Sequence, residues 1–244
     1  MIAQEISRIR IYEQQPLRAV AGNTIRPGGL TLTEHALKFC DLPFGARVLD
    51  VGCGPGASVE YLMQQNRFVA VGIDPSPLLL SDAHCRNESL SLAQSPGEVL
   101  PFASSSFDAI MTECSLSVMD HPDQAMEEFH RVLSKGGYLV ITDVYARNRN
   151  GVADLRCLNI DSCLRGAMLQ DEVMTLVQAH GFKVTLWEDH TQALRVFTAQ
   201  LIWTYGSVGN FWCRTMSARH DTPVVQSVIA QSKPGYFLLI ARKL

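Results

Sequence analysis

Short runs of β-branched and other apolar residues alternate along the chain with segments whose apolar residues recur every three or four positions. The short runs predict strands, and the spacing of three or four predicts amphipathic helices. The clearest strands are expected at 47–51, 68–73, 107–113 and 138–142, each followed or preceded by a helical segment. This alternation is typical of βαβ units, so the chain is predicted to fold around a parallel sheet.

Three further strands complete the predicted sheet. One is expected at 90–94, mainly from its place between stronger neighbours, and two follow later at 182–187 and 236–241. A helix over 169–180 is closed by a glycine. The segment 193–212 is rich in Leu, Ile, Phe, Trp and Tyr, which predicts a packed helix rather than a membrane span.

Three glycines, Gly52, Gly54 and Gly56, follow the strand 47–51 directly. Without side chains they let the backbone come close to a bound group. Their spacing is one residue shorter than that of the dinucleotide-binding turn, which makes a pyrophosphate a poorer fit. Asp74 ends the next strand, where a carboxylate can accept hydrogen bonds from both hydroxyls of a ribose. The pattern favours a nucleoside without a diphosphate.

Four segments at 50–56, 72–74, 100–108 and 131–137 resemble, in order and spacing, the class I S-adenosylmethionine-dependent methyltransferases, and among them the type 11, UbiE-like group. The resemblance implies an α/β fold: a Rossmann-like, mostly parallel sheet of seven strands with helices on both faces and an antiparallel last strand. It also implies S-adenosyl-L-methionine as the cofactor. The resemblance covers roughly residues 30 to 145, and the late strands agree with the implied sheet.

The resemblance and the neighbouring residues give a set of expected cofactor contacts. In the family, the positions of Asp50, Gly52 and Gly54 surround the methionine part of the cofactor, that of Asp74 holds the ribose, and Pro75 with its neighbour lies along the adenine. Cys53 is read as a small filler rather than a reactive thiol. The expected residues are Arg26, Asp50, Gly52, Cys53, Gly54, Asp74, Pro75, Ser76, Gly97, Glu98, Glu113 and Cys114.

One position departs from the family pattern at the expected adenine site. The family often carries an acidic residue that accepts the adenine amino group, and this chain has Pro96 there. The backbone amides of Gly97 and Glu98 could meet the ring instead, and the Glu98 side chain is a candidate replacement.

Arg26 lies in the segment that precedes the first helix, together with two glycines and two threonines. A guanidinium there would suit the carboxylate of the cofactor if the N-terminal segment folds over the glycine loop. The same residues also suit a helix start capped by Thr31 or Thr33, and both readings can hold together.

The acceptor side is expected at 113–115 and 143–145, which follow two neighbouring strands. Methyl transfer needs mainly an in-line approach of the nucleophile, so no particular side chain is obligatory. Glu113, Asp143 and His190 are the candidates for a proton acceptor. Whether a general base is used is left open.

The C-terminal third contains aromatic and cysteine residues with two readings each. Either an aromatic pocket, or part of the core or of a dimer contact, is expected from Trp203, Tyr205, Phe211 and Trp212. Cys157, Cys163 and Cys213 either bind a soft metalloid such as arsenite or are inert buried thiols. No metal site is expected from the cysteine spacing.

Composition narrows the class of protein further. The net charge of −3 argues against a nucleic-acid backbone or an anionic membrane as the main partner. The start of the chain lacks the pattern of a secretory signal, and no apolar run reaches membrane-spanning length. A cytoplasmic protein with reduced cysteines, present as a monomer or homodimer, is expected.

The predicted protein is one methyltransferase domain over 1–244, with an N-terminal arm or lid (1–30), a cofactor-binding core (31–145) and a part that completes the sheet and adds substrate contacts (146–244). The expected function is methylation of an unidentified small molecule. Two alternatives stay open: methylation of arsenite or another thiophilic species, and a non-catalytic protein that binds the nucleoside. A nicotinamide-dependent oxidoreductase is disfavoured by the glycine spacing.

Overall fold

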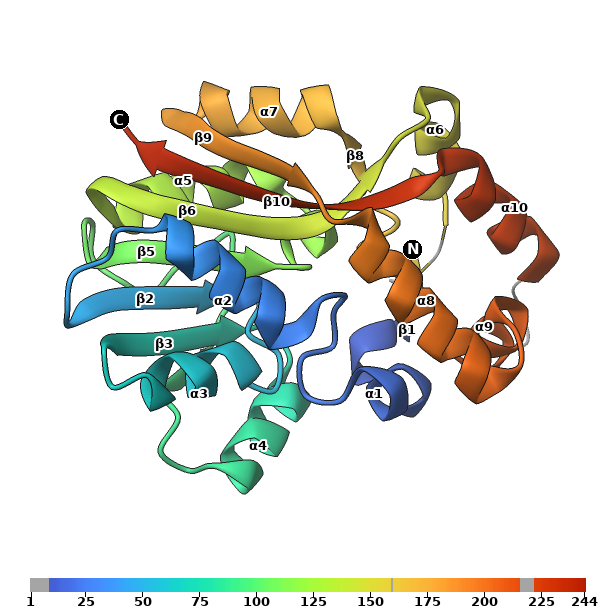
Figure 1. The fold of residues 1–244 in the computed structure, drawn as a ribbon, viewed down its shortest axis with the longest axis horizontal. Coiled ribbons are helices and arrows are strands. Elements are labelled where there is room, and N and C mark those ends of the chain that lie inside the picture. Colours follow the sequence, from blue (N-terminus) through green and yellow to red (C-terminus); the bar gives the residue numbers. More distant parts are fainter. Residues whose placement is uncertain (1–8, 159, 216–221) are drawn as a thin grey trace, which may run out of the picture.

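The computed structural model describes residues 9–158, 160–215 and 222–244, so the first eight residues of the predicted arm lie outside the described residues. A twisted sheet forms the centre of the molecule (Figure 1). The order across it is β4 (Leu92–Gln94), β3 (Phe68–Asp74), β2 (Ala46–Val51), β5 (Phe107–Glu113), β6 (Leu133–Ala146), β10 (Pro234–Lys243) and β9 (Phe182–Asp189). A two-residue strand, β8 (Met168–Leu169), adds to the edge of β6.

The strand directions confirm the predicted fold class. The pairs formed by β4, β3, β2, β5 and β6 are all parallel. The last strand, β10, inserts between β6 and β9 and runs antiparallel to both. Val48 and Leu49 in β2 face opposite sides of the sheet and are both fully buried, as expected for a parallel strand covered on both faces.

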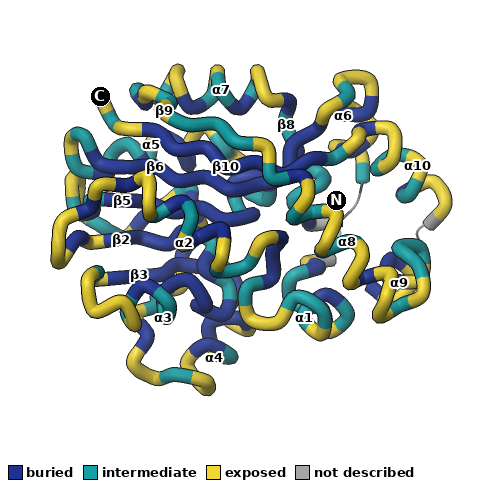
Figure 2. Tube along the Cα trace, in the orientation of Figure 1, coloured by how far each residue is buried: buried dark blue, intermediate teal, exposed yellow. Residues whose placement is uncertain are grey.

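Helices cover both faces of the sheet, and each face has its own apolar core (Figures 1 and 2). Apolar residues of α2 (Gly29–Phe39), α3 (Ala57–Gln64) and α4 (Pro77–Arg86) pack on one face. Those of α5 (Pro122–Val132) and α7 (Gln170–Ala179) pack on the other. Alternate residues along each strand enter opposite cores, so both faces are closed to water.

Several predicted strands differ from the structure by one or two residues at an end, and two predictions need a larger correction. The strand expected at 138–142 is β6, which already begins at Leu133, because a register shift against β5 accommodates the glycines near 136. The single helix expected at 193–212 is two helices, α8 (Thr191–Tyr205) and α9 (Val208–Thr215). Gly206 separates them with a φ of 81°, a left-handed conformation that glycine adopts without steric cost.

Several small elements gather beyond the carboxyl ends of the parallel strands, at the right of Figure 1. They are β1 (Ile9–Arg10), which pairs with β7 (Ile160–Asp161), the 3-10 helix η1 (Ile11–Glu13), α1 (Gln15–Ala21), α8, α9 and α10 (Thr222–Ser232). α6 (Val152–Arg156) and two more 3-10 helices, η2 (Leu116–Val118) and η3 (Arg149–Gly151), complete the described elements. Across 9–158, 160–215 and 222–244, no helix combines the length and apolar character needed to cross a membrane.

Helix α1, near the N-terminus, contacts both α8 in the C-terminal part and α4 beside the sheet. The Tyr205 hydroxyl on α8 donates to the Pro16 carbonyl on α1 at 2.7 Å. Arg18 on α1 pairs with Asp82 on α4 at 2.5 Å. These contacts place the segment after residue 9 across the strand ends, where a ligand crevice is expected in an open α/β sheet.

Candidate cofactor and acceptor site

A cavity of about 490 Å³ opens at the carboxyl ends of β2, β3 and β5. β3 and β5 flank β2, so the cavity lies at the point where the order of the strands reverses along the sheet. All twelve residues expected to contact the cofactor line this single cavity: Arg26, Asp50, Gly52, Cys53, Gly54, Asp74, Pro75, Ser76, Gly97, Glu98, Glu113 and Cys114. Its volume lies in the range typical of small-molecule sites.

The glycine loop is shaped by a close approach to the end of β5. A Cβ atom on Gly52 would lie 2.4 Å from the Cβ atom of Ser115, and Gly52 has a φ of 77°. The Gly52 and Cys53 amides both donate to the Ile73 carbonyl, at 2.8 and 2.9 Å. Glycine is therefore required at position 52 for both space and conformation, and the first two loop amides bind the protein itself.

Asp74 is held at the end of β3 by two backbone amides. The Gly54 amide donates to Asp74 Oδ2 at 2.9 Å, and the Ser76 amide donates to Oδ1 at 2.8 Å. Burial raises the pKa of Asp74, and these two hydrogen bonds oppose the increase. A carboxylate offers about four lone-pair positions, so each oxygen can accept one further hydrogen bond from a ligand.

A buried ion pair joins Arg26 to Glu113. Their side chains are 6% and 3% exposed, and Arg26 Nη2 lies 2.9 Å from Glu113 Oε2. Two hydroxyls bridge the pair: Thr33 and Ser58 each accept from Nη2, at 2.6 and 2.9 Å, and donate to Glu113, at 2.8 and 2.6 Å. Glu113 thus holds the guanidinium in place, and its two oxygens are already engaged.

One donor atom of Arg26 is unused within the described part of the protein. Its Nε is buried and has no hydrogen-bond partner among the residues that the structure describes. An unpaired buried donor on a cation is costly unless a ligand accepts from it. Arg26 itself lines the cavity, so its positive charge favours an anionic group such as a carboxylate at this end of the cavity.

Asp50 is the second carboxyl group at this end of the cavity. Burial and the nearby Glu113 raise the pKa of Asp50 to about 8, and Arg26 opposes the shift. The group is therefore largely protonated at neutral pH while no cation is bound. A positively charged ligand group would favour its ionised form.

The expected adenine side is built from the loop after β4. Pro96, Gly97 and Glu98 all line the cavity. Glu98 Oε1 accepts hydrogen bonds from the backbone amides of Asp120 and His121, at 3.0 and 3.3 Å. Glu98 therefore also joins this loop to the segment before α5.

A second cavity of about 400 Å³ adjoins the first, and Tyr12, Ile25 and Cys114 line both. The Tyr12 hydroxyl accepts a hydrogen bond from the Cys163 amide at 2.8 Å. A hydrogen bond to Cys163 and burial raise the pKa of Cys114 well above its usual value. Burial likewise raises the pKa of Tyr12, so both groups at the junction are neutral at ordinary pH.

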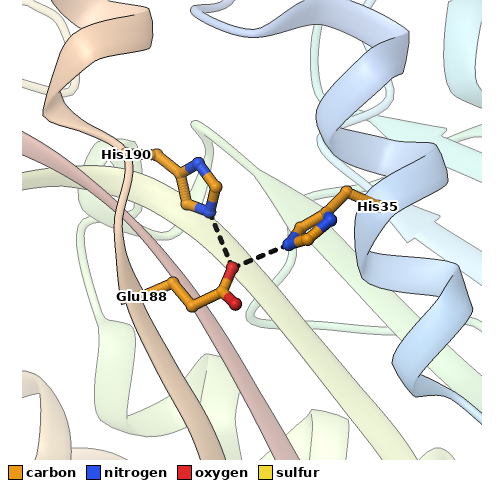
Figure 3. A group of neighbouring side chains, drawn as sticks. All are labelled: His35, Glu188 and His190. Carbon is orange, nitrogen blue, oxygen red and sulfur yellow. Dashed lines mark hydrogen bonds and ion pairs between the residues drawn. The ribbon is translucent and has the colours of Figure 1, made fainter.

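Two candidate proton acceptors lie outside both linings. Asp143 is buried, accepts from the Ser117 amide and hydroxyl at 2.9 and 2.6 Å, and has a pKa raised to about 6 by burial. His190 follows β9, and its Nε2 lies 2.9 Å from Glu188 Oε2, which also contacts His35 Nε2 at 2.8 Å (Figure 3). Glu113, which lines the first cavity, is the only one of the three candidates placed at a cavity.

The three C-terminal cysteines do not come together. Cys157 and Cys213 are exposed, and Cys163 is half-buried. Among the described residues, the sulfur of Cys163 groups instead with Cys114 and the carboxyl of Asp143. The structure thus provides no site built from the expected three thiols.

The four aromatic residues differ in their surroundings, and Trp203 lies neither in the core nor at a cavity. Trp203 is 92% exposed and contributes to neither cavity. Phe211 and Trp212 are buried and line the second cavity. Tyr205 packs against Phe211 with ring centroids 6.0 Å apart, outside the lining.

The most important residue missed by the sequence reasoning is Tyr12. It lies in a segment without a motif, and its partner Cys163 is far away in the chain. The only available signal was the apolar character of Ile9, Ile11 and Tyr12 within a mostly polar N-terminal segment.

Comparisons with known proteins agree with this architecture. Residues 49–141 match the family model for a methyltransferase domain. The methyltransferase GfsG of Streptomyces halstedii is 34% identical over 125 residues, which are 49% of this chain and 45% of that protein. The chain spans about half the length of the first curated relatives that it matches.

Two solved structures share the fold. The [4+2]-cyclase SpnF superposes with a TM-score of 0.75 at 24% identity, over 96% of this chain and 93% of that one. A phosphoethanolamine N-methyltransferase 2 of Haemonchus contortus, solved with S-adenosyl-L-methionine, has a TM-score of 0.70 at 19% identity, over 93% of this chain and 56% of that one. The domain match thus identifies residues 49–141 as a methyltransferase domain, and the two solved structures share the fold of the chain around it.

Proposed function

We propose that the protein transfers a methyl group from S-adenosyl-L-methionine to a small molecule. The observation that carries the proposal is the arrangement of two adjoining cavities: one lined by all the expected cofactor residues, the other joined to it at Tyr12, Ile25 and Cys114. A donor in the first cavity and an acceptor in the second would meet at this junction.

The side chains of the first cavity suit the chemical groups of the cofactor. The positive charge of Arg26 suits a carboxylate, and Asp50 can pair with an ammonium group. Asp74 has capacity for two ribose hydroxyls, and Pro75, Ser76 and Gly97 line the expected adenine side. The cofactor would supply an electrophilic methyl group on a sulfonium ion.

An acceptor held at the junction would offer an electron pair to that methyl carbon, and the electron pair of the carbon–sulfur bond would stay on sulfur. A nucleophile that carried a proton loses it to solvent or to a base. At the junction, the protein's own contribution is to align the two ligands and exclude water. Cys114 and Tyr12 are neutral there, so neither supplies a basic group at ordinary pH.

Methylation of a thiophilic species has little support, because the expected cysteines lie apart. A non-catalytic nucleoside-binding protein is the second outcome of the test below. Cytoplasmic location and a monomeric or homodimeric state stay predictions from the sequence.

The test is an acceptor screen with S-adenosylmethionine labelled on the methyl group. Label should move into one or a few small molecules, with an equal amount of S-adenosylhomocysteine formed. Protein, RNA and phospholipid fractions serve as the other arms of the screen. Tight nucleoside binding without transfer in any arm would contradict catalysis and favour the binding protein.

The affinity for S-adenosylmethionine is expected to fall as the pH falls below about 8. Asp50 is then protonated in the free protein, and a cationic ligand favours its carboxylate, so binding requires the loss of a proton. The affinity should approach a tenfold decrease per pH unit between about pH 8 and pH 6. Calorimetry in buffers of different ionisation enthalpy would show the released proton. Asp50→Asn should weaken binding and flatten this dependence, and equal wild-type affinities across the range would contradict the account.

A further inference from the structure

Two histidines and a glutamate form a group of potential metal ligands outside both cavities, between α2 and the end of β9 (Figure 3). His35 Nε2 lies 2.8 Å from Glu188 Oε2, and His190 Nε2 lies 2.9 Å from the same oxygen. The two imidazole rings have centroids 5.6 Å apart. One nitrogen of each histidine and a carboxylate oxygen of Glu188 all lie within 4.8 Å of one another. Side chains from distant parts of the sequence thus direct their donor atoms to one place.

Regular structure holds each of these three residues. His35 lies within α2, and its ring packs edge-on against Phe39 one turn later, with ring centroids 5.1 Å apart. Glu188 lies within β9, which pairs with β10. The backbone amide of His190 donates to the Tyr236 carbonyl at 2.7 Å, directly before α8 begins. The sheet, α2 and the start of α8 therefore set the positions of the three side chains.

Two imidazole nitrogens and one carboxylate oxygen suit a divalent transition metal such as Zn²⁺. Mg²⁺ and Ca²⁺ prefer oxygen ligands alone, and soft ions prefer sulfur, which this group lacks. Zn²⁺ lies about 2.0–2.2 Å from such ligands, so two tetrahedral ligands are about 3.4 Å apart. Each nitrogen needs to move away from the carboxylate oxygen by only about 0.5 Å to admit the ion.

Glu188 supplies a negative charge to the group. Burial opposes its ionisation, but hydrogen bonds from His190 and His35 outweigh burial and lower the pKa of Glu188. The ionised carboxylate accepts from both rings, so each Nε2 carries a hydrogen in this arrangement. A metal ion replaces these hydrogens, because a ligating imidazole nitrogen offers its lone pair to the ion.

An ion can reach the group from solvent. The side chains of His35, Glu188 and His190 are 40%, 29% and 27% exposed. Three protein ligands leave one position of a tetrahedral zinc ion for water. None of the three residues lines either cavity. An ion bound here would therefore act on the packing of the helices and not on the transferred methyl group.

We propose that His35, Glu188 and His190 bind one divalent transition-metal ion of the zinc type, which links α2 to the start of α8. α2 also carries Thr33, which bonds to the buried ion pair at the first cavity, and α8 supplies part of the lining of the second. The ion would hold these two walls together. The inference does not rest on the proposed function, because none of the three residues has a part in methyl transfer.

Calorimetric titration of the EDTA-treated, dialysed protein with Zn²⁺ tests the proposal, with Mg²⁺ as the control ion. The tightest event should be one Zn²⁺ per chain with micromolar affinity or better, and Mg²⁺ should give no measurable binding. Glu188→Gln and His190→Ala should each weaken this event at least about tenfold, a loss that changes next to a ligand already reach. His84→Ala, at an exposed histidine of α4 outside the group, should leave the affinity within about twofold.

Co²⁺ in place of Zn²⁺ identifies the ligands. The protein has exposed thiols, and Cys114 and Cys163 form a second group with the carboxyl of Asp143. Thiolate bound to Co²⁺ gives strong charge-transfer absorption in the near ultraviolet, whereas nitrogen and oxygen ligands give weaker visible bands. The first equivalent of Co²⁺ should show the visible bands without the thiolate absorption, and Zn²⁺ should remove them.

Hydrogen exchange tests the link between the helices. Zn²⁺ should slow exchange of the backbone amides of α2 and of the first turn of α8 in the wild type, and not in Glu188→Gln. Exchange that Zn²⁺ leaves unchanged would contradict the link. No Zn²⁺ binding by the wild type, thiolate absorption from the first equivalent of Co²⁺, or equal affinities in wild type and Glu188→Gln would each overturn the metal site. The wild-type titration and spectrum can overturn it even if the variants fail to fold.

Discussion

Replacing Glu113 by glutamine is expected to lower the free energy of unfolding by about 3 kcal/mol, because Arg26 is left as a buried cation without its counterion. The value lies at the low end of the range for broken buried pairs. We expect the low end because Asp50 can partly replace the lost counterion. Glu113 contributes to the raised pKa of Asp50, so with glutamine at position 113 Asp50 ionises more easily near Arg26. Chemical denaturation at neutral pH, followed by circular dichroism, measures the change.

Two controls distinguish this effect from a general sensitivity to lost carboxylates. Glu34→Gln breaks an exposed pair with Lys38 on α2 and should change stability by less than about 1 kcal/mol. Combining Glu113→Gln with Arg26→Met removes the uncompensated charge and should recover part of the loss. A cost below about 1 kcal/mol for Glu113→Gln would show that the pair is not the buried contact described here.

Replacing Asp74 by alanine is expected to weaken binding of S-adenosylmethionine about a hundredfold or more. Two hydrogen bonds from ribose hydroxyls to a charged group are lost, each worth about 1.5–3 kcal/mol. The Gly54 and Ser76 amides also lose their acceptor, which loosens the loop on the wall of the cavity. Calorimetric titration measures the affinity.

Asp82→Ala is the matched control for this variant. Asp82 lies on the helix that follows Asp74, pairs with Arg18 and does not line the cavity. Its removal should leave the nucleoside affinity within about twofold of wild type. Equal affinities for Asp74→Ala and wild type would mean that the carboxylate does not hold the ribose.

The sheet was predictable from the sequence because its strands are short, apolar runs between helical periods. β5 begins and ends at the predicted residues, and β2 and β3 differ from prediction by one residue each. The site residues near the strand ends were predictable for a related reason. The carboxyl ends of neighbouring parallel strands meet at one edge, so residues 50–54, 74 and 113 must come together.

The second cavity could not be predicted in the same way. Its walls come from the N-terminal segment and from α8, α9 and α10, which have no common motif. The contact between Tyr12 and Cys163 depends on how these elements pack on the sheet, and that packing is set by tertiary contacts. The break between α8 and α9 had a local signal in Gly206, which the apolar pattern around it obscured.

The sequence also could not predict which neighbours the side chains near the strand ends contact. Asp143 was expected just after a strand, but β6 extends past it to Ala146, and its carboxyl accepts from the amide and hydroxyl of Ser117. His190 pairs with Glu188 and lines neither cavity. Position along the chain predicted the end of the sheet, but not which face or neighbour each side chain would meet.

The most direct test of the central claim is a calorimetric titration of the wild-type protein with S-adenosylmethionine and S-adenosylhomocysteine, with NAD as a matched nucleotide control. The account predicts one site per chain for both nucleosides, with micromolar affinity or better, and no measurable binding of NAD. If neither nucleoside binds, or if NAD binds instead, the cavity at the ends of β2, β3 and β5 does not hold the proposed cofactor.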